Sequence, residues 1–143
     1  MRILADVNVV VSSAIAPLGM PRAIIEAWQA ESIGLVTADG IIAEVDEKLH
    51  STRIRTKYHL TEALIGTAID LLRMQAEVVR VPARAVVPVT GDPEDDYVLA
   101  AAVQGRVDYL VTGDKGLLAL GSYQGIPIVS PREFLRLFHP AES

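Results

Sequence analysis

The chain has 143 residues, of which half are hydrophobic and 22% are charged, and its formal net charge is −5 at pH 7. This length predicts one domain, residues 1–143, with a large apolar core. The lack of cysteine excludes disulfides and thiolate metal sites, and the negative charge argues against broad, non-specific coating of nucleic acid. The N-terminus reaches Asp6 too soon for a signal peptide, and no apolar stretch approaches the roughly 20 residues that span a bilayer. We therefore expect a cytoplasmic protein with no membrane association.

Short apolar runs alternate along the chain with stretches of helical spacing. The apolar runs predict strands at 3–5, 33–37, 78–81, 109–112 and 126–129. The helical spacing predicts helices from about 21 to 31, 39 to 49, 61 to 72, 92 to 103 and from 131 onward. No helix is predicted between the first strand and Gly19, and 83–91 and the segment between 112 and 126 are expected to be loops. The alternation predicts an α/β protein with three layers, α/β/α, around a central parallel sheet.

Two of the predicted strands run into an aspartate. Asp6 follows Ala5 directly, and Asp114 follows Thr112 and Gly113. Open α/β sheets bind ligands outside the carboxyl ends of their strands, so both carboxylates are expected at one edge. Gathered carboxylates repel one another and lose hydration, and therefore need a cation; oxygen ligands without cysteine favour Mg²⁺ or Mn²⁺. The alternative for each aspartate alone is a helix cap or a turn.

Two further places supply acids to this edge. Glu44 lies at the border of the apolar stripe of its helix, where the alternative role is a surface pair with Lys48. Asp95 and Asp96 lie in the first turn of a helix that is apolar on every side and must be buried. A carboxylate there needs a partner, and a metal ion is one candidate.

These pieces, in this order and spacing, resemble a PIN-domain ribonuclease of the VapC-like kind, the toxin half of bacterial and archaeal toxin–antitoxin pairs. The matching pieces are Ile3-Leu4-Ala5-Asp6-Val7-Asn8, the helix with Glu44, Asp92-Pro93-Glu94-Asp95-Asp96 followed by Leu99-Ala100, and Tyr109-Leu110-Val111-Thr112-Gly113-Asp114-Lys115. The resemblance covers nearly the whole chain. It implies a PIN-like fold, an RNA substrate, a small antitoxin partner and a metal-dependent endoribonuclease.

The resemblance also implies the site residues. They are Asp6, Glu44, one of Asp95 and Asp96, and Asp114. A pattern of an acid three residues before an aliphatic residue and two alanines selects Asp96, whereas an Asp-Pro-x-Asp helix start selects Asp95, which we favour slightly.

The chemistry agrees with these residue types. One or two divalent ions held by carboxylates acidify a water molecule and stabilise charge on the leaving oxygen of a phosphodiester. Asn8 and Thr112 are expected to position water or phosphate, since neither can neutralise a metal.

One stretch of the chain, 48–59, is basic and contains no acid. It includes Arg53, Arg55 and Lys57, which flank the helix that bears Glu44. Contact with RNA phosphates is one interpretation and a solvated helix end is the other. An aliphatic surplus (Ile24, Ile25, Trp28, Leu137 and Phe138) indicates either a larger core or an exposed face for a homodimer or an antitoxin.

Two other function classes compete with a nuclease. An aspartyl-phosphate hydrolase also begins with an apolar strand that ends in aspartate, but it needs an acid two residues later, where this chain has Asn8. A PIN-like scaffold that binds metal or RNA without turnover is the non-enzymatic alternative. Cleavage of RNA with Mn²⁺, stopped by EDTA, separates the nuclease from the scaffold.

Overall fold

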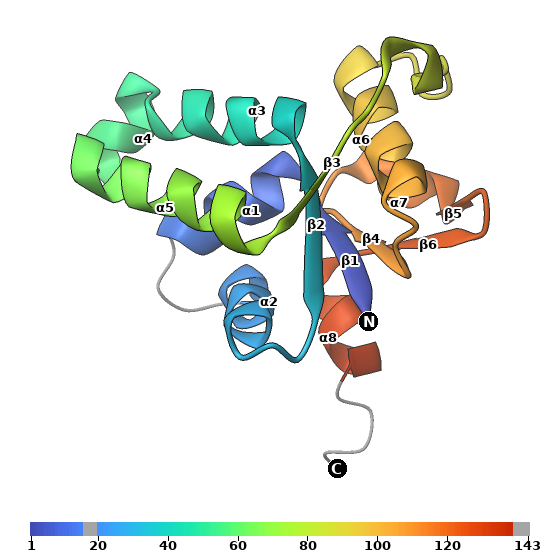
Figure 1. The fold of residues 1–143 in the computed structure, drawn as a ribbon, viewed down its shortest axis with the longest axis horizontal. Coiled ribbons are helices and arrows are strands. Elements are labelled where there is room, and N and C mark those ends of the chain that lie inside the picture. Colours follow the sequence, from blue (N-terminus) through green and yellow to red (C-terminus); the bar gives the residue numbers. More distant parts are fainter. Residues whose placement is uncertain (16–19, 139–143) are drawn as a thin grey trace.

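The structure, a computed structural model that describes residues 1–15 and 20–138, contains a six-stranded sheet (Figure 1). Its strands are β1 (Arg2–Ala5), β2 (Gly34–Ala38), β3 (Glu77–Val79), β4 (Tyr109–Val111), β5 (Ser122–Tyr123) and β6 (Ile126–Val129). They lie in the order β3-β2-β1-β4-β6-β5, and every neighbouring pair is parallel except β5 with β6. The chain order therefore reverses direction across the sheet at β1, which places the carboxyl end of β1 at a switch point of the topology.

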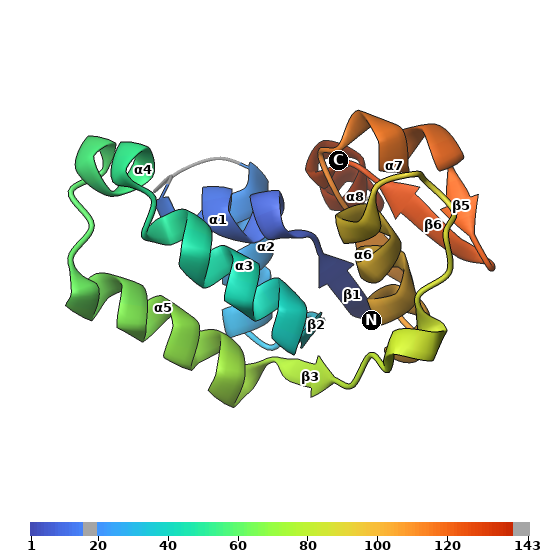
Figure 2. The same cartoon turned by 90° about the horizontal axis from the view of Figure 1, so that it is seen from above.

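The described residues also form eight α-helices. They are α1 (Val7–Ile15), α2 (Met20–Gln29), α3 (Asp39–Leu49), α4 (Thr52–Lys57), α5 (Glu62–Gln75), α6 (Pro93–Gln104), α7 (Lys115–Leu120) and α8 (Pro131–Phe138), with one 3₁₀ turn at Ala83–Ala85. Helices α1, α2, α3 and α5 lie on one side of β1 and β2, and α6 lies on the other (Figures 1 and 2). The prediction of a three-layer α/β/α fold with a central, mostly parallel sheet is confirmed.

The core follows the apolar runs of the sequence. Ile3, Leu4 and Ala5 of β1 are at most 1% exposed, because helices cover both faces of the central strand. Helix α6 is buried on most sides through 98–102, as its composition predicted. Of the surplus apolar residues noted in the sequence, Ile24, Ile25 and Trp28 belong to the core. Phe138 stacks on the buried Phe134, and Leu137 is 45% exposed. A homodimer remains a prediction.

Helix α1 is one of the elements that the sequence did not predict; α4, α7 and β5 are others. Four of its nine residues are valine, a β-branched residue that loses side-chain freedom in a helix. The side chain of Asp6 accepts a hydrogen bond from the backbone N–H of Val9 (3.1 Å) and caps the helix. All four valines are buried, so packing outweighs the weak local propensity.

The expectation of a loop between 112 and 126 is wrong. The segment forms α7 and the short strand β5, and Asp114 caps α7 by accepting a hydrogen bond from the backbone N–H of Leu117 (2.9 Å). Leu117 is fully buried, which ties this short glycine-containing helix to the core.

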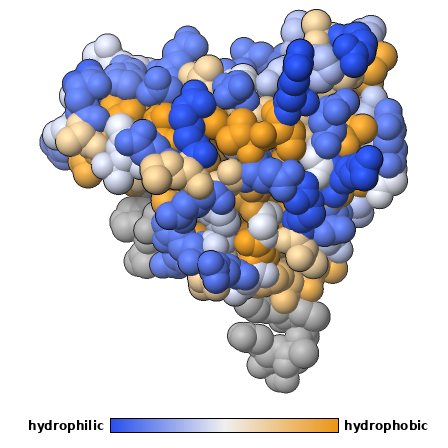
Figure 3. Space-filling view, viewed as in Figure 1, coloured by the Kyte–Doolittle hydropathy of each residue, from blue (hydrophilic) through white to orange (hydrophobic). Residues whose placement is uncertain are grey.

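The face of the molecule over α5 and β3 is mostly hydrophilic, with smaller apolar areas between the polar side chains (Figure 3). Leu64, Met74 and Val78 are the large apolar side chains that α5 and β3 expose. Among the described residues, no helix combines the length and apolar character needed to cross a membrane.

Candidate active site

The site is built on the pairing of β1 with β4. Ala5 lies opposite Val111 in this parallel pair, so the residues that follow, Asp6 and Thr112, leave the sheet side by side. The hydroxyl of Thr112 donates a hydrogen bond to Asp6 Oδ2 and accepts one from the backbone N–H of Asp114 (3.0 Å). Thr112 is thus a buried link between the two aspartates.

Asp6 is held rigidly at the end of β1. Its Oδ1 accepts the Val9 N–H, its Oδ2 accepts the Thr112 hydroxyl, and the residue is only 6% exposed. Burial raises the pKa of Asp6; the hydrogen bonds from Thr112 and Val9 oppose this rise, and the neighbouring charge of Asp114 adds to it. A buried carboxylate with a raised pKa is one that a cation stabilises strongly.

Asp95 and Asp96 point in different directions. Asp95 lines a small pocket with Asp6 and Asp114, and burial together with the charges of Asp114 and Asp92 raises the pKa of Asp95 to about 6. A hydrogen bond between the carboxyl groups of Asp95 and Asp114 also favours the protonated form of Asp95. When both are ionised, these two carboxylates therefore repel each other, as grouped carboxylates do without a counter-ion.

The carboxylate of Asp96 is hydrogen-bonded to the loop before α6. Its Oδ1 accepts hydrogen bonds from the backbone N–H groups of Val89 (3.1 Å) and Thr90 (2.8 Å) and from the Thr90 hydroxyl (2.9 Å). The bonds from Thr90 and then Val89 lower the pKa of Asp96. Asp95 lines the pocket and Asp96 does not, which favours Asp95 of the two alternatives; the ligand assignment itself stays a prediction.

Glu44 reaches the same pocket from α3. Helices α3 and α6 lie on opposite sides of the carboxyl end of β1 (Figures 1 and 2), and both contribute to the pocket wall. Burial raises the pKa of Glu44, the charge of Glu94 raises it further, and Lys48 opposes the rise. Lys48 is one turn from Glu44, but its Nζ donates a hydrogen bond to Asn8 Oδ1 (3.0 Å).

The resulting pocket has a volume of about 50 Å³. Its acidic lining residues are Asp6, Glu44, Glu94, Asp95 and Asp114. Lys48 is the one basic residue that lines it within the described part of the chain. The pocket therefore carries an excess of negative charge that a small cation would offset.

A family model describes residues 2–116 of this chain, which include every acid of the pocket, as a PIN domain. The chain belongs to the PIN domain family. Members of this family are generally nucleases, a class of hydrolase. No curated protein sequence matches the chain.

Three solved structures resemble this PIN domain. VapBC2 from Rickettsia felis, bound to a DNA fragment from their promoter, has 11% identity, a TM-score of 0.62 and coverage of 91% of this chain and 98% of the other. PAE2754 from Pyrobaculum aerophilum has 17% identity, a TM-score of 0.63 and coverage of 98% and 99%. FitAcB from Neisseria gonorrhoeae has 17% identity, a TM-score of 0.53 and coverage of 91% and 98%. At these identities the likeness is one of fold.

The donor groups of the PIN-domain pocket fit a divalent ion in kind. They are carboxylates, the ligands that Mg²⁺ and Mn²⁺ prefer, and Asp95 and Asp114 share a hydrogen bond that a cation would replace. Within residues 1–15 and 20–138, however, no three acidic or imidazole groups already stand together as a metal site. The side chains would therefore have to move inward for an ion to bind.

Two charged residues of the pocket were not among those expected from the sequence. Lys48 was treated as a surface partner of Glu44, although its spacing of one helical turn from Glu44 places both on the same face. Glu94, to which the sequence assigned no role in the site, lines the pocket with Asp95. Neither role is visible without knowing how α3 and α6 face each other.

The basic stretch divides in the structure. Arg53 and Lys57 line a second hollow beside Asn8. Arg55 does not join them, because its Nη1 pairs with Glu62 Oε1 (3.1 Å) and its Nε donates to the carbonyl oxygen of Leu60 (3.4 Å). The structure thus places Arg53 and Lys57 together and Arg55 apart from them, and contact of this stretch with RNA stays a prediction.

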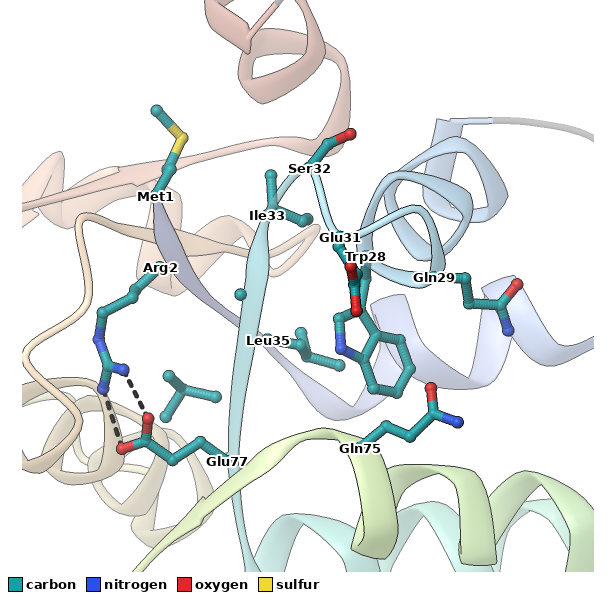
Figure 4. Close-up of a pocket in the computed structure, with 12 residues that line it drawn as sticks. Met1, Arg2, Trp28, Gln29, Glu31, Ser32, Ile33, Leu35, Gln75 and Glu77 are labelled. Carbon is teal, nitrogen blue, oxygen red and sulfur yellow. Dashed lines mark hydrogen bonds and ion pairs between the residues drawn. The ribbon is translucent and has the colours of Figure 1, made fainter.

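A larger hollow, of about 800 Å³, lies at the opposite, amino edge of the sheet (Figure 4). The Arg2 guanidinium and the Glu77 carboxylate form an ion pair there, and their hydrogen bond lowers the pKa of Glu77. The side chains of Trp28 and Gln75 lie across the hollow from this pair. Arg2 and Glu77 neutralise each other, and Glu31 is the remaining acid that lines this hollow, so it lacks the cluster of acids found in the pocket at the carboxyl edge.

Proposed function

We propose that this PIN domain is an endoribonuclease that hydrolyses RNA with Mg²⁺ or Mn²⁺ and acts as the toxin of a toxin–antitoxin pair. The observation that carries the proposal is the convergence of Asp6, Asp95 and Asp114 on one small pocket, where the pKa of Asp95 rises to about 6. Perturbed carboxyl groups in a cleft are typical of catalytic sites. The family, which is generally one of nucleases, supports the same reaction class.

We assign Asp6, Asp95 and Asp114 as the groups that would hold the metal, with Glu44 binding it directly or through water. When bound, a divalent ion supplies a more acidic water and stabilises charge on the phosphate oxygens. Thr112 keeps Asp6 oriented by donating to Oδ2, and it also fixes the start of the Asp114 loop. Lys48 holds the amide of Asn8 at the rim, where that amide can orient a water molecule or a phosphate oxygen.

The antitoxin partner rests on the structural neighbours. VapBC2 of Rickettsia felis is a complex bound to promoter DNA, and FitAcB of Neisseria gonorrhoeae shares the fold with a lower TM-score. We extend from them the partner class alone: a small antitoxin protein that binds this domain.

The experiment compares wild-type protein with Asp6→Asn on single-stranded RNA in Mn²⁺ and in EDTA. Asp6→Asn keeps the shape of the side chain and one oxygen that can accept the Val9 N–H, and its amide N–H can donate to the Thr112 hydroxyl in place of the bond that Oδ2 accepts. It removes the charge, so we expect cleavage to be abolished in a folded protein. Circular dichroism checks the fold. Cleavage by folded Asp6→Asn at the wild-type rate would refute the proposed site, and wild-type protein that binds Mn²⁺ but cuts no RNA would support the scaffold alternative instead.

A further inference from the structure

A second hollow, of about 290 Å³, lies between α1 and α4. Its volume is close to the lower end of ligand pockets, which begin at about 300 Å³. Asn8 lines both this hollow and the acidic pocket, so α1 leads directly from one to the other. We call it the α1–α4 hollow.

Two cations face the α1–α4 hollow. Arg53 and Lys57 are four residues apart on α4 and therefore lie on the same side of that helix. In the part of the chain that the structure describes, neither has a carboxylate within ion-pair distance, whereas Arg55 between them is paired with Glu62. The chain thus neutralises the arginine that points away and leaves the two inward-facing cations for an anion.

The remaining walls suit a planar ring. Tyr58 is 38% exposed at the hollow, and Lys57 Nζ lies 5.4 Å from the centroid of its ring. Ile54 adds an apolar surface, and Asn8 and Ser12, one turn apart on α1, present an amide and a hydroxyl. An aromatic ring, an apolar surface and side-chain hydrogen-bonding groups are the elements with which proteins bind an unpaired base, and neighbouring cations bind its phosphates.

We propose that the α1–α4 hollow is a nucleotide subsite that holds one unpaired base of single-stranded RNA. The base stacks on Tyr58, Arg53 and Lys57 bind the adjacent phosphates, and the strand continues along α1 past Asn8 into the acidic pocket. The inference rests on the proposed ribonuclease function and adds that the substrate is single-stranded next to the cut. An RNA strand is favoured over a protein segment because the unpaired charges are positive and the aromatic ring lies beside them.

The first test is a double-mutant cycle that combines a change of Tyr58 in the protein with removal of a base from the RNA. Binding of a fluorescein-labelled, eight-nucleotide single-stranded RNA is measured by anisotropy in EDTA, with an abasic residue placed at each position in turn. At one position the abasic RNA should bind wild-type protein roughly five- to a hundredfold more weakly. Tyr58→Ala should weaken binding of the intact RNA by a similar factor. In this variant the abasic residue should have no further effect on binding, because both changes delete the same stacking interaction. Tyr58→Phe keeps the ring and should bind like wild type.

The second test concerns the phosphates. The double variant Arg53→Ala, Lys57→Ala should weaken binding and lower the slope of log affinity against log salt by roughly 0.7 for each phosphate that is no longer neutralised. The control is Arg55→Ala, which removes one positive charge from the same helix outside the hollow and should leave the slope unchanged. Annealing the RNA to its complement should remove the dependence on Tyr58.

The outcomes separate the subsite from the nuclease. If wild-type protein cleaves RNA in Mn²⁺ while Tyr58→Ala and the double variant bind like Arg55→Ala, the subsite is refuted and a protein partner becomes the better occupant. If binding depends on Tyr58 but no RNA is cleaved, the proposed ribonuclease function fails and the subsite stands. Circular dichroism of each variant excludes unfolding as the cause of weaker binding.

Discussion

At the scale of single residues, two adjacent carboxylates of α6 have opposite properties. Asp95 faces other acids and has a raised pKa of about 6, whereas Asp96 accepts three hydrogen bonds from Val89 and Thr90 and has a lowered pKa. Neighbouring helix positions point about 100° apart, so one residue can face the pocket while the next holds a loop. The two side chains are chemically identical, and their surroundings alone distinguish them.

This contrast predicts different effects of two matched variants on activity. Asp95→Asn should reduce metal-dependent RNA cleavage by at least a hundredfold, on the order of 3 kcal/mol of transition-state stabilisation. Asp96→Asn should retain most activity and instead lose roughly 1 kcal/mol of folding stability, because its hydrogen bonds lose their charge. The measurements are cleavage rates in Mn²⁺ and chemical denaturation. A severe loss of activity in stable Asp96→Asn, with Asp95→Asn near wild type, would reverse the assignment.

The same pair predicts opposite dependences of stability on pH in metal-free protein. The folded state raises the pKa of Asp95, so the folded protein binds more protons than the unfolded chain between about pH 4 and pH 6. The contribution of Asp95 to stability is full below that range and is lost as the pH rises through it. Asp95→Asn should therefore gain stability relative to wild type between pH 4 and pH 7.

Asp96 provides the opposite sign as a control. Its folded pKa is lowered, so its contribution is present above the unfolded value and is lost as the pH falls. The stability deficit of Asp96→Asn relative to wild type should therefore shrink toward acidic pH. Urea denaturation at several pH values in EDTA measures both differences, and parallel curves for wild type and Asp95→Asn would contradict the raised pKa.

At the scale of elements, the pocket depends on how α3 and α6 meet. Ala38, at the N-cap of α3, has no side chain that can cap the helix. The hydroxyl of Tyr97 on α6 supplies the missing acceptor, receiving a hydrogen bond from the backbone N–H of Gly40 (3.1 Å). A Cβ on Gly40 would come within 2.7 Å of the Tyr97 ring, so glycine permits the close approach of the helices that carry Glu44 and Asp95.

Gly40→Ala should therefore push α3 away from α6. We expect a loss of about 1–3 kcal/mol in stability from overpacking and a weaker affinity for Mn²⁺, since Glu44 moves away from Asp95. The matched control is Gly66→Ala in α5, where a Cβ meets nothing within 4 Å. That change should stabilise the protein by roughly 0.5–1 kcal/mol, because alanine is the better helix former. Equal effects of the two substitutions, in thermal unfolding and Mn²⁺ titration, would show that the contact with Tyr97 does not set the helix spacing.

At the scale of the whole molecule, the acidic pocket joins both sides of the sheet. Its carboxylates come from the end of β1, from α3, from α6 and from the start of α7. A cation held among them would connect elements that otherwise repel one another. Ligand binding to the folded state alone should therefore raise the stability of the entire domain.

We expect Mn²⁺ to raise the melting temperature of the wild-type protein relative to EDTA. At 100 times the dissociation constant the gain is about 2.7 kcal/mol. Asp6→Asn should lose most of this gain, and its melting temperature in EDTA should exceed that of wild type because repulsion in the pocket is relieved. The salt concentration is matched with NaCl, and a wild-type melting temperature that Mn²⁺ leaves unchanged would count against the metal site.

The sequence by itself determined the layered fold and the edge where the acids gather. Buried apolar runs ending in Asp6 and Asp114 predicted parallel strands with their carboxyl ends together, because such strands need no polar face and cannot use an aspartate. The composition of α6 likewise predicted its burial. These features follow from local patterns of hydrophobicity, which can be recognised without knowing which elements pack against each other.

Only the tertiary structure decided which side chains meet. The rotation of α6 against the sheet selects Asp95 over Asp96, and the cap from Asp6 together with burial makes a helix of the valine-rich segment 7–15. The packing of α4 likewise turns Arg55 toward Glu62 and leaves Arg53 and Lys57 beside α1. Each outcome depends on the relative orientation of two elements far apart in the chain, and a local pattern does not contain that angle.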